Sequence, residues 1–187
     1  MIRKITILFF VLTALLLAAE KSTELDPCKL LTKQEVEKVL GTEMREGRLS
    51  KSGAVFGTLS CSYLSVDRFE KSASATLTIG TTAFMKANDA VFESAKEKYE
   101  KEKNAYKEAL KRKNRADTFE AVEGVGDDAY WGTVALHILQ GDAVLAIKVS
   151  ASSGMSAKSS QELKKMVKER NFTLSKEIAK IVLPKLK

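Results

Sequence analysis

The residues best able to do chemistry in this 187-residue chain are two cysteines, one histidine, a pair of aspartates and a pair of aromatic residues. Cys28 and Cys61 are the only cysteines, and an even number of cysteines in an oxidising compartment predicts a disulfide. A thiol nucleophile or redox centre is the alternative, but such a cysteine usually lies in a CxxC motif or beside a base, and the sequence shows neither. We therefore predict one structural disulfide.

His137 is the only histidine, and it lies within an alternating segment over 134–139. The alternation places its side chain on the opposite side of a strand from Leu136 and Ile138. A metal site needs further ligands at a characteristic spacing, and no HxxxH or CxxC motif accompanies this histidine. We interpret His137 as a sheet-face residue, with a role as a catalytic base or metal ligand as the alternative.

Asp127 and Asp128 follow two glycines, Gly124 and Gly126, and could bind a cation or a ligand. A calcium loop spreads several oxygen ligands over about 12 residues, and this segment has no such series. The two glycines also lack the third glycine and the following helix of a dinucleotide site. Glycines that supply positive φ, beside an aspartate that accepts backbone hydrogen bonds, are typical of a tight turn. We predict a turn here, and no metal or cofactor.

Tyr130 and Trp131 are the best candidates for ligand recognition, because an exposed aromatic pair beside a turn can stack on a sugar, a peptide or an apolar ligand. In a strand the two rings point to opposite sides, so we expect one in the core and the other at a site. Together with Asp127 and Asp128 they form our candidate ligand-binding set. The sequence has no G-x-S-x-G motif, which argues against a serine hydrolase.

The N-terminal segment predicts export. Two basic residues near the start precede an apolar run over 5–17, which ends in small residues before a polar segment. This order is typical of a secretory signal peptide, here cleaved after Ala19, and the run is shorter than the roughly 20 apolar residues that cross a membrane. We therefore expect a signal peptide over 1–19, a single domain over 20–187, a periplasmic or secreted location, and no stable membrane span after cleavage.

Capping motifs and periodicity predict the helices. Thr32 and Glu35 have capping-box spacing, which predicts a short helix that ends at Gly41. A repeating apolar stripe predicts one long helix over 84–113, whose charged face over Lys96–Lys113 could dock a partner.

The C-terminal part of the chain predicts a further helix, and the remaining segments predict strands. Ser159 and Glu162 repeat the capping-box spacing, and a helical face follows as far as Pro184, with a break expected near Asn171. The β-like segments are 42–50, 54–65, 73–82, 118–122, 134–139 and 143–149, the last two joined as a hairpin.

Three motifs occur in order along the chain: D-P-C-x-L-L-T over 26–32, C-x-Y over 61–63, and G-x-G-D-x-A-Y-W over 124–131. Together they resemble a family of exported bacterial proteins of unknown function, best known as actinobacterial lipoproteins. The resemblance implies an α/β/α sandwich similar to the photosystem oxygen-evolving P protein, and a Cys28–Cys61 bridge. This chain departs from the family in lacking a lipid-attachment cysteine, and the family has no assigned chemistry.

The sequence as a whole predicts one α+β domain, with a mainly antiparallel sheet and packed helices. Its formal net charge is +7, with both signs spread along the chain and no aromatic residues interleaved with a basic stripe, so no nucleic-acid partner is expected. We expect a non-enzymatic binding or interaction module for an unknown small ligand or envelope protein. The alternatives are an envelope docking protein that uses the charged Lys96–Lys113 face, and an uncharacterised hydrolase.

Overall fold

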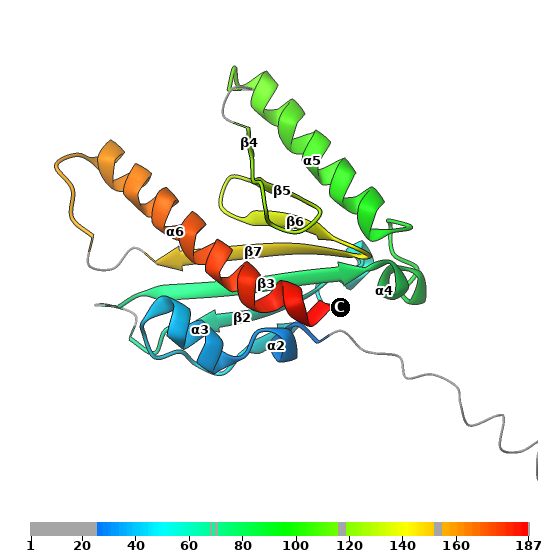
Figure 1. Cartoon of the computed structure of the whole chain (residues 1–187), viewed down its shortest axis with the longest axis horizontal. Helices are drawn as coiled ribbons and strands as arrows, with labels where there is room; N and C mark the ends of the chain where they lie inside the picture. Colours follow the sequence, from blue (N-terminus) through cyan, green and yellow to red (C-terminus); the bar gives the residue numbers. More distant parts are fainter. Residues whose placement is uncertain (1–25, 68, 70, 116–118, 152–154, 187) are drawn as a thin grey trace, which may run out of the picture.

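The computed structural model describes residues 26–186, apart from 68, 70, 116–118 and 152–154 (Figure 1). The predicted signal peptide, 1–19, lies outside the described residues. Within them, a seven-stranded antiparallel sheet has helices on both faces, so the predicted α+β fold is confirmed.

The sheet has the strand order β1-β2-β3-β7-β6-β5-β4. The long central pair, β3 with β7, joins two strands that are far apart in the sequence, over nine residue pairs. The strands are β1 (Arg48–Ser50), β2 (Leu59–Leu64), β3 (Ala73–Thr81), β4 (Glu120–Ala121), β5 (Asp128–Trp131), β6 (Leu136–Gln140) and β7 (Ala143–Ala151).

The helices begin where a side chain caps the first backbone N–H groups. Thr32 and Glu35 form the predicted capping box, and Ser159 accepts from the backbone N–H of Glu162. The helices are α2 (Pro27–Leu30), α3 (Lys33–Leu40), α4 (Thr82–Ala87), α5 (Ala95–Arg112) and α6 (Ser160–Val182), with short 3-10 turns η2 (Ala54–Phe56) and η4 (Leu183–Leu186). No described helix is long and apolar enough to span a bilayer.

The two faces of the sheet pack against different helices, which gives the α/β/α layers of the predicted sandwich (Figure 1). One face is covered by α2, α3 and α6, and its buried core includes Cys61, Leu77, Leu136, Leu145, Ile147 and Ile178. On the other face α5 lies over β6 and β7, above a smaller cluster of Met85, Ala95, Tyr99, Tyr130, Leu139 and Val144.

The sheet face that packs against α5 becomes polar beyond β7, at β2 and β3. Here β2 and β3 present partly exposed hydroxyl side chains, since Ser60 pairs with Thr78 and Ser62 pairs with Thr76. The Ser62 and Thr76 hydroxyls are 3.1 Å apart and share a hydrogen bond. This half of the face is therefore polar, whereas the half beneath α5 is apolar.

The predicted disulfide is confirmed. Cys28, in α2, is bonded to Cys61, in β2, with their Cα atoms 5.2 Å apart. The bond fixes the first described helix to the sheet, and it lies beside Tyr63, whose hydroxyl donates a hydrogen bond to the carbonyl of Leu31.

Four sequence predictions of element bounds are wrong. Within the β-like segment 54–65 only Leu59–Leu64 forms a strand, because 54–56 form the 3-10 turn η2, which ends at Gly57 in the left-handed conformation. The helix expected over 84–113 is two helices, because the backbone turns at Asp89 (φ +47°) and α5 begins afresh after Ser94, which caps it. The break expected near Asn171 is absent, since α6 runs unbroken over Ser160–Val182. The β-like segment 42–50 contains only the short strand β1 and an isolated bridge from Met44 to Ser65.

Candidate functional site

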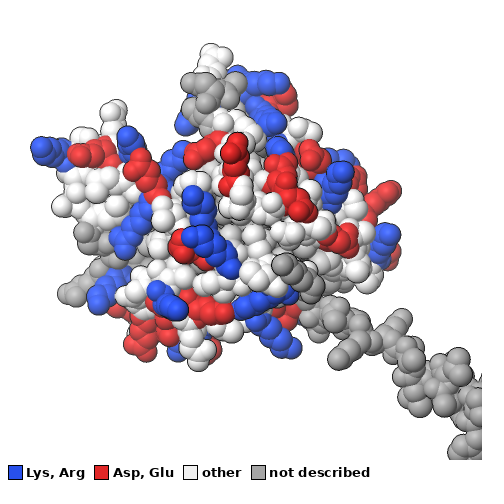
Figure 2. All heavy atoms as spheres, viewed as in Figure 1, with Lys and Arg blue, Asp and Glu red and all other residues white. Residues whose placement is uncertain are grey.

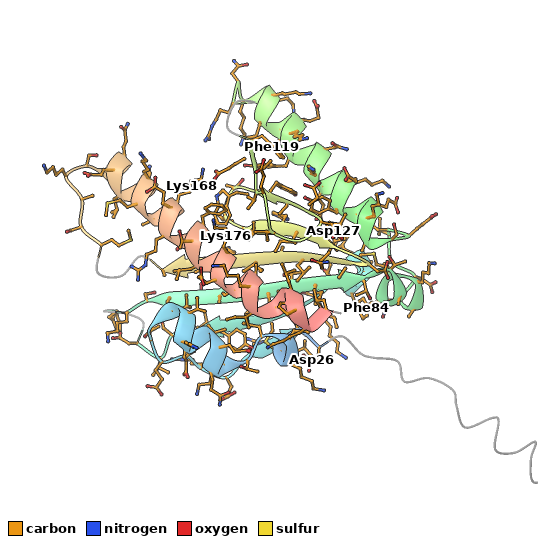
Figure 3. All side chains as sticks on the ribbon, in the orientation of Figure 1. Asp26, Phe84, Phe119, Asp127, Lys168 and Lys176 are labelled. Carbon is orange, nitrogen blue, oxygen red and sulfur yellow. A yellow bond between two sulfur atoms is a disulfide. The ribbon has the colours of Figure 1, made fainter. Side chains whose placement is uncertain are left out.

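Asp127 holds two turns together (Figure 3). Its backbone N–H donates to the Leu139 carbonyl at 2.8 Å, and its carboxylate accepts from the backbone N–H of Gly141. The turn before β5 is thereby tied to the hairpin between β6 and β7. This is the role expected of a turn aspartate.

Asp128 lies at the start of β5 and faces α5. Its carboxylate forms an ion pair with Lys103, whose side chain is only 15% exposed. The pair joins β5 to the middle of α5 and leaves this carboxylate engaged within the protein.

Tyr130 and Trp131 point to opposite faces of the sheet, as expected for consecutive strand residues, but both rings are buried, each 2% exposed. Tyr130 belongs to the cluster under α5, where it packs against Tyr99 with ring centroids 5.7 Å apart. Trp131 belongs to the larger core, where it meets the edge of Phe172 on α6 at 5.1 Å. The structure therefore keeps Asp128 and Tyr130 together on the α5 face and places Trp131 on the opposite face.

A single row of residues crosses the sheet beneath α5. The strand register pairs Ser60 with Thr78, Thr78 with Ala146, Ala146 with His137, and His137 with Tyr130. Directly paired residues lie on the same side of a sheet, so all five side chains share the α5 face. The predicted sheet-face position of His137 agrees with this register.

A groove lies along this row, and we call it the α5 groove. It has a volume of about 480 Å³. Its floor comprises Thr78, Val144, Ala146 and His137, and its walls come from η2, the loop before α5 and α5 itself. The wall residues are Phe56, Thr58, Phe92, Lys98 and Glu102.

His137 lies flat on Tyr130, with ring centroids 4.7 Å apart and an angle of 3° between the rings. Burial lowers the pKa of His137 below its ordinary value of 6.5, and nearby Lys98 lowers it further, while Glu102 opposes the shift. The imidazole is therefore neutral at pH 7 and can donate one hydrogen bond and accept another.

Lys98 and Glu102 form an ion pair one turn apart on α5, and the Lys98 side chain is only 9% exposed. The ammonium group also lies 4.8 Å from the centre of the Phe92 ring, a distance that gives a cation–π interaction. The two charges compensate each other, so the α5 groove carries little net charge.

Sequence reasoning identified His137 and Tyr130 but missed Phe56, Phe92 and Lys98. These residues come from separate parts of the chain and meet only through the sheet register and the packing of α5. A charged residue at position 98 inside a polar helix gives no signal of burial. Within the described parts of the chain, no three His, Cys, Asp or Glu side chains gather as metal ligands would.

Comparison with known proteins adds no assignment, since no protein-family model, curated protein or solved structure matches the chain. The resemblance to exported bacterial lipoproteins stays a prediction from the sequence motifs.

Proposed function

We propose that the protein is an exported, non-enzymatic binding module that holds a small ligand in the α5 groove. The observation that carries this proposal is the groove itself. Its volume of about 480 Å³ lies within the range of small-molecule sites, and its lining combines apolar surface with a few polar groups.

The lining indicates the chemistry of the ligand. Phe56, 52% exposed, and Phe92 offer aromatic surface, which favours a flat apolar body. Neutral His137 and the hydroxyl of Thr78 can each make a hydrogen bond, and the charge of Lys98 is already matched by Glu102. We therefore expect an uncharged ligand with an apolar body and a few polar groups.

Export is supported by the sequence of the N-terminal segment and by the disulfide. Disulfides persist mainly in oxidising compartments, such as the periplasm or the extracellular space. The Cys28–Cys61 bond therefore agrees with a periplasmic or secreted location.

The alternative, an envelope protein that docks through the Lys96–Lys113 face, has less support. Four of the lysines in this range have acidic partners: Lys98 pairs with Glu102, Lys101 with Glu97, Lys103 with Asp128, and Lys111 with Glu108. On the side of the molecule drawn in Figure 2, acidic and basic residues are likewise interspersed. A surface of matched pairs gives little attraction to a charged partner.

Native mass spectrometry of the protein, purified gently from its own host, tests the proposal. We expect a non-covalent adduct of defined mass. Ala146→Phe places a ring on the groove floor and should abolish the adduct, whereas Ser74→Phe, on the same sheet face but outside the groove, should keep it.

Two results would contradict the proposal. An adduct that persists in Ala146→Phe would place the ligand elsewhere. A reproducible turnover that is lost in His137→Ala would mean that the groove is an active site.

A further inference from the structure

A second groove lies between the N-terminal half of α6 and the end of β7, and we call it the α6 groove. Its volume is about 370 Å³, and it shares no lining residue with the α5 groove. It forms because β7 is longer than its neighbour: β3 pairs with all of β7, whereas β6 pairs only as far as Ile147.

The strand register shows which main-chain groups face this groove. The N–H and C=O groups of Ala73 both bond to Ser65, on the β2 side of β3, so those of its partner Ala151 point away from β3. The N–H and C=O groups of Val149, two residues earlier, point the same way, toward the side where β6 has ended. The Ala151 N–H donates to the Asn171 side chain at 3.0 Å, while Val149 lines the groove without a strand partner among the described residues on that side.

Most of the lining is apolar. Leu163 and Val167 project from successive turns of α6, and Val134, 52% exposed, faces them from the turn between β5 and β6. Trp131 contributes its ring from the sheet. A groove of this kind accommodates a hydrocarbon chain.

Trp131 also carries a buried hydrogen-bond donor. Its indole N–H has no partner among the described residues, although the side chain is 2% exposed. The N–H is itself buried, like the unpaired hydroxyls of Tyr99 and Ser175, so it does not open into the groove.

Two lysines of α6, Lys164 and Lys168, line the groove. Lys148 on β7 also lines it, but its pairing with Thr76 places its side chain on the α5 face of the sheet. Lys168 is paired with Glu120, at 2.9 Å, on the side of α6 that faces β4 (Figure 3). No acidic residue lines the groove among the described residues. The lining therefore combines apolar surface with positive charge from α6.

We propose that the α6 groove binds a free medium-chain fatty acid. The hydrocarbon chain matches the apolar lining, and a carboxylate matches the lysines of α6, Lys164 and Lys168. A neutral or cationic chain of the same length would satisfy only the apolar part. The proposal is independent of the function proposed for the α5 groove.

Trp131 is the only tryptophan, so its fluorescence reports directly on this groove. The full chain is titrated with dodecanoate, dodecanol and dodecylammonium, each kept below the concentration at which it forms micelles. We expect dodecanoate to change the Trp131 emission and to bind at least tenfold more tightly than either analogue.

Two matched pairs of variants locate the site. Lys164→Glu should weaken dodecanoate binding at least tenfold, whereas Lys165→Glu, at the next residue of the helix but outside the groove, should not. Val134→Glu should also weaken binding, whereas Val66→Glu, at a comparably exposed valine elsewhere, should leave it unchanged. All variants keep the same N-terminal segment, so that segment cannot account for a difference between them.

The proposal is overturned if dodecanoate does not bind, if dodecanol binds equally well, or if both members of each variant pair behave alike. Binding to vesicles of anionic phospholipid without binding of dodecanoate would also overturn it, because the groove would then recognise a membrane surface.

Discussion

At the residue scale, His137 makes the stability of the protein depend on pH in the mildly acidic range. Its pKa in the folded protein lies below 6.5 because the ring is buried against Tyr130, with Lys98 nearby. The unfolded chain therefore binds a proton at a pH where the folded chain does not, and unfolding is favoured as the pH falls below about 6.5. We expect the free energy of unfolding, measured with urea, to decrease over this range.

The variant His137→Phe keeps a ring over Tyr130 and removes the titrating group. Its urea stability should vary less between pH 7 and pH 5 than that of the wild type. Tyr130→Phe keeps the histidine and serves as the control, so it should retain the wild-type slope. Equal slopes for the wild type and His137→Phe would show that other groups cause the pH dependence.

Tyr63 makes a single buried hydrogen bond that fixes the end of α2. Its ring is 1% exposed, and its hydroxyl donates to the Leu31 carbonyl. Tyr63→Phe keeps the ring but leaves that carbonyl without this donor, so we expect a loss of about 1–3 kcal/mol in the free energy of unfolding. Chemical denaturation measures it, and a loss below 0.5 kcal/mol would show that water replaces the hydroxyl.

At the element scale, two glycines allow η2 to pack against the end of β3. A Cβ atom on Gly80 would lie 2.2 Å from the carbonyl oxygen of Gly57, which is backbone and cannot move aside easily. We expect Gly80→Ala to destabilise the fold by about 3 kcal/mol, at the upper end for overpacking. Gly124→Ala has open space around its Cβ and only a positive φ to accommodate, so its cost should be about 1 kcal/mol. Thermal denaturation compares the two, and equal losses would contradict the steric argument.

The sequence predicted those elements whose signals are local. The capping box at Thr32 and the N-cap at Ser159 mark helix starts in the structure, and the hairpin around Gly141 joins β6 to β7 as expected. The prediction of one long helix over 84–113 was wrong because apolar residues continue at helical spacing through a loop. The sequence does contain a signal for the start of α5, in Ser94 and Glu97, which are three residues apart. This signal outweighs the apolar stripe because the cap satisfies free N–H groups at the helix start.

The candidate grooves could not be predicted in the same way. His137 was placed correctly on the sheet face by alternation alone. Its neighbours Lys98 and Phe92 come from a helix and a loop, and their position depends on how α5 crosses the sheet. Trp131 and Tyr130 are both buried, because each face of β5 is covered by a helix. We expected one ring at a site, since alternation cannot show whether one face or both are covered.

At the scale of the whole molecule, the disulfide contributes through the unfolded chain. Cys28 and Cys61 are separated by 33 positions, and closing a loop of this length stabilises the folded state by about 3–4 kcal/mol in the chain-entropy model. Reduction of the wild type, or the double variant Cys28→Ala with Cys61→Ala, should lower the free energy of unfolding by this amount. Urea denaturation with and without reductant measures it, and the double variant should not respond to reductant.

The position of β7 sets the order in which this protein can mature. It is the last strand in the chain, yet it lies at the centre of the sheet between β3 and β6. A chain emerging N-terminus first from a ribosome or a translocation pore holds β1–β3 and β4–β6 as two separate halves until 143–151 appear. The core is therefore completed only after 143–151 have appeared, because β7 joins the two halves of the sheet.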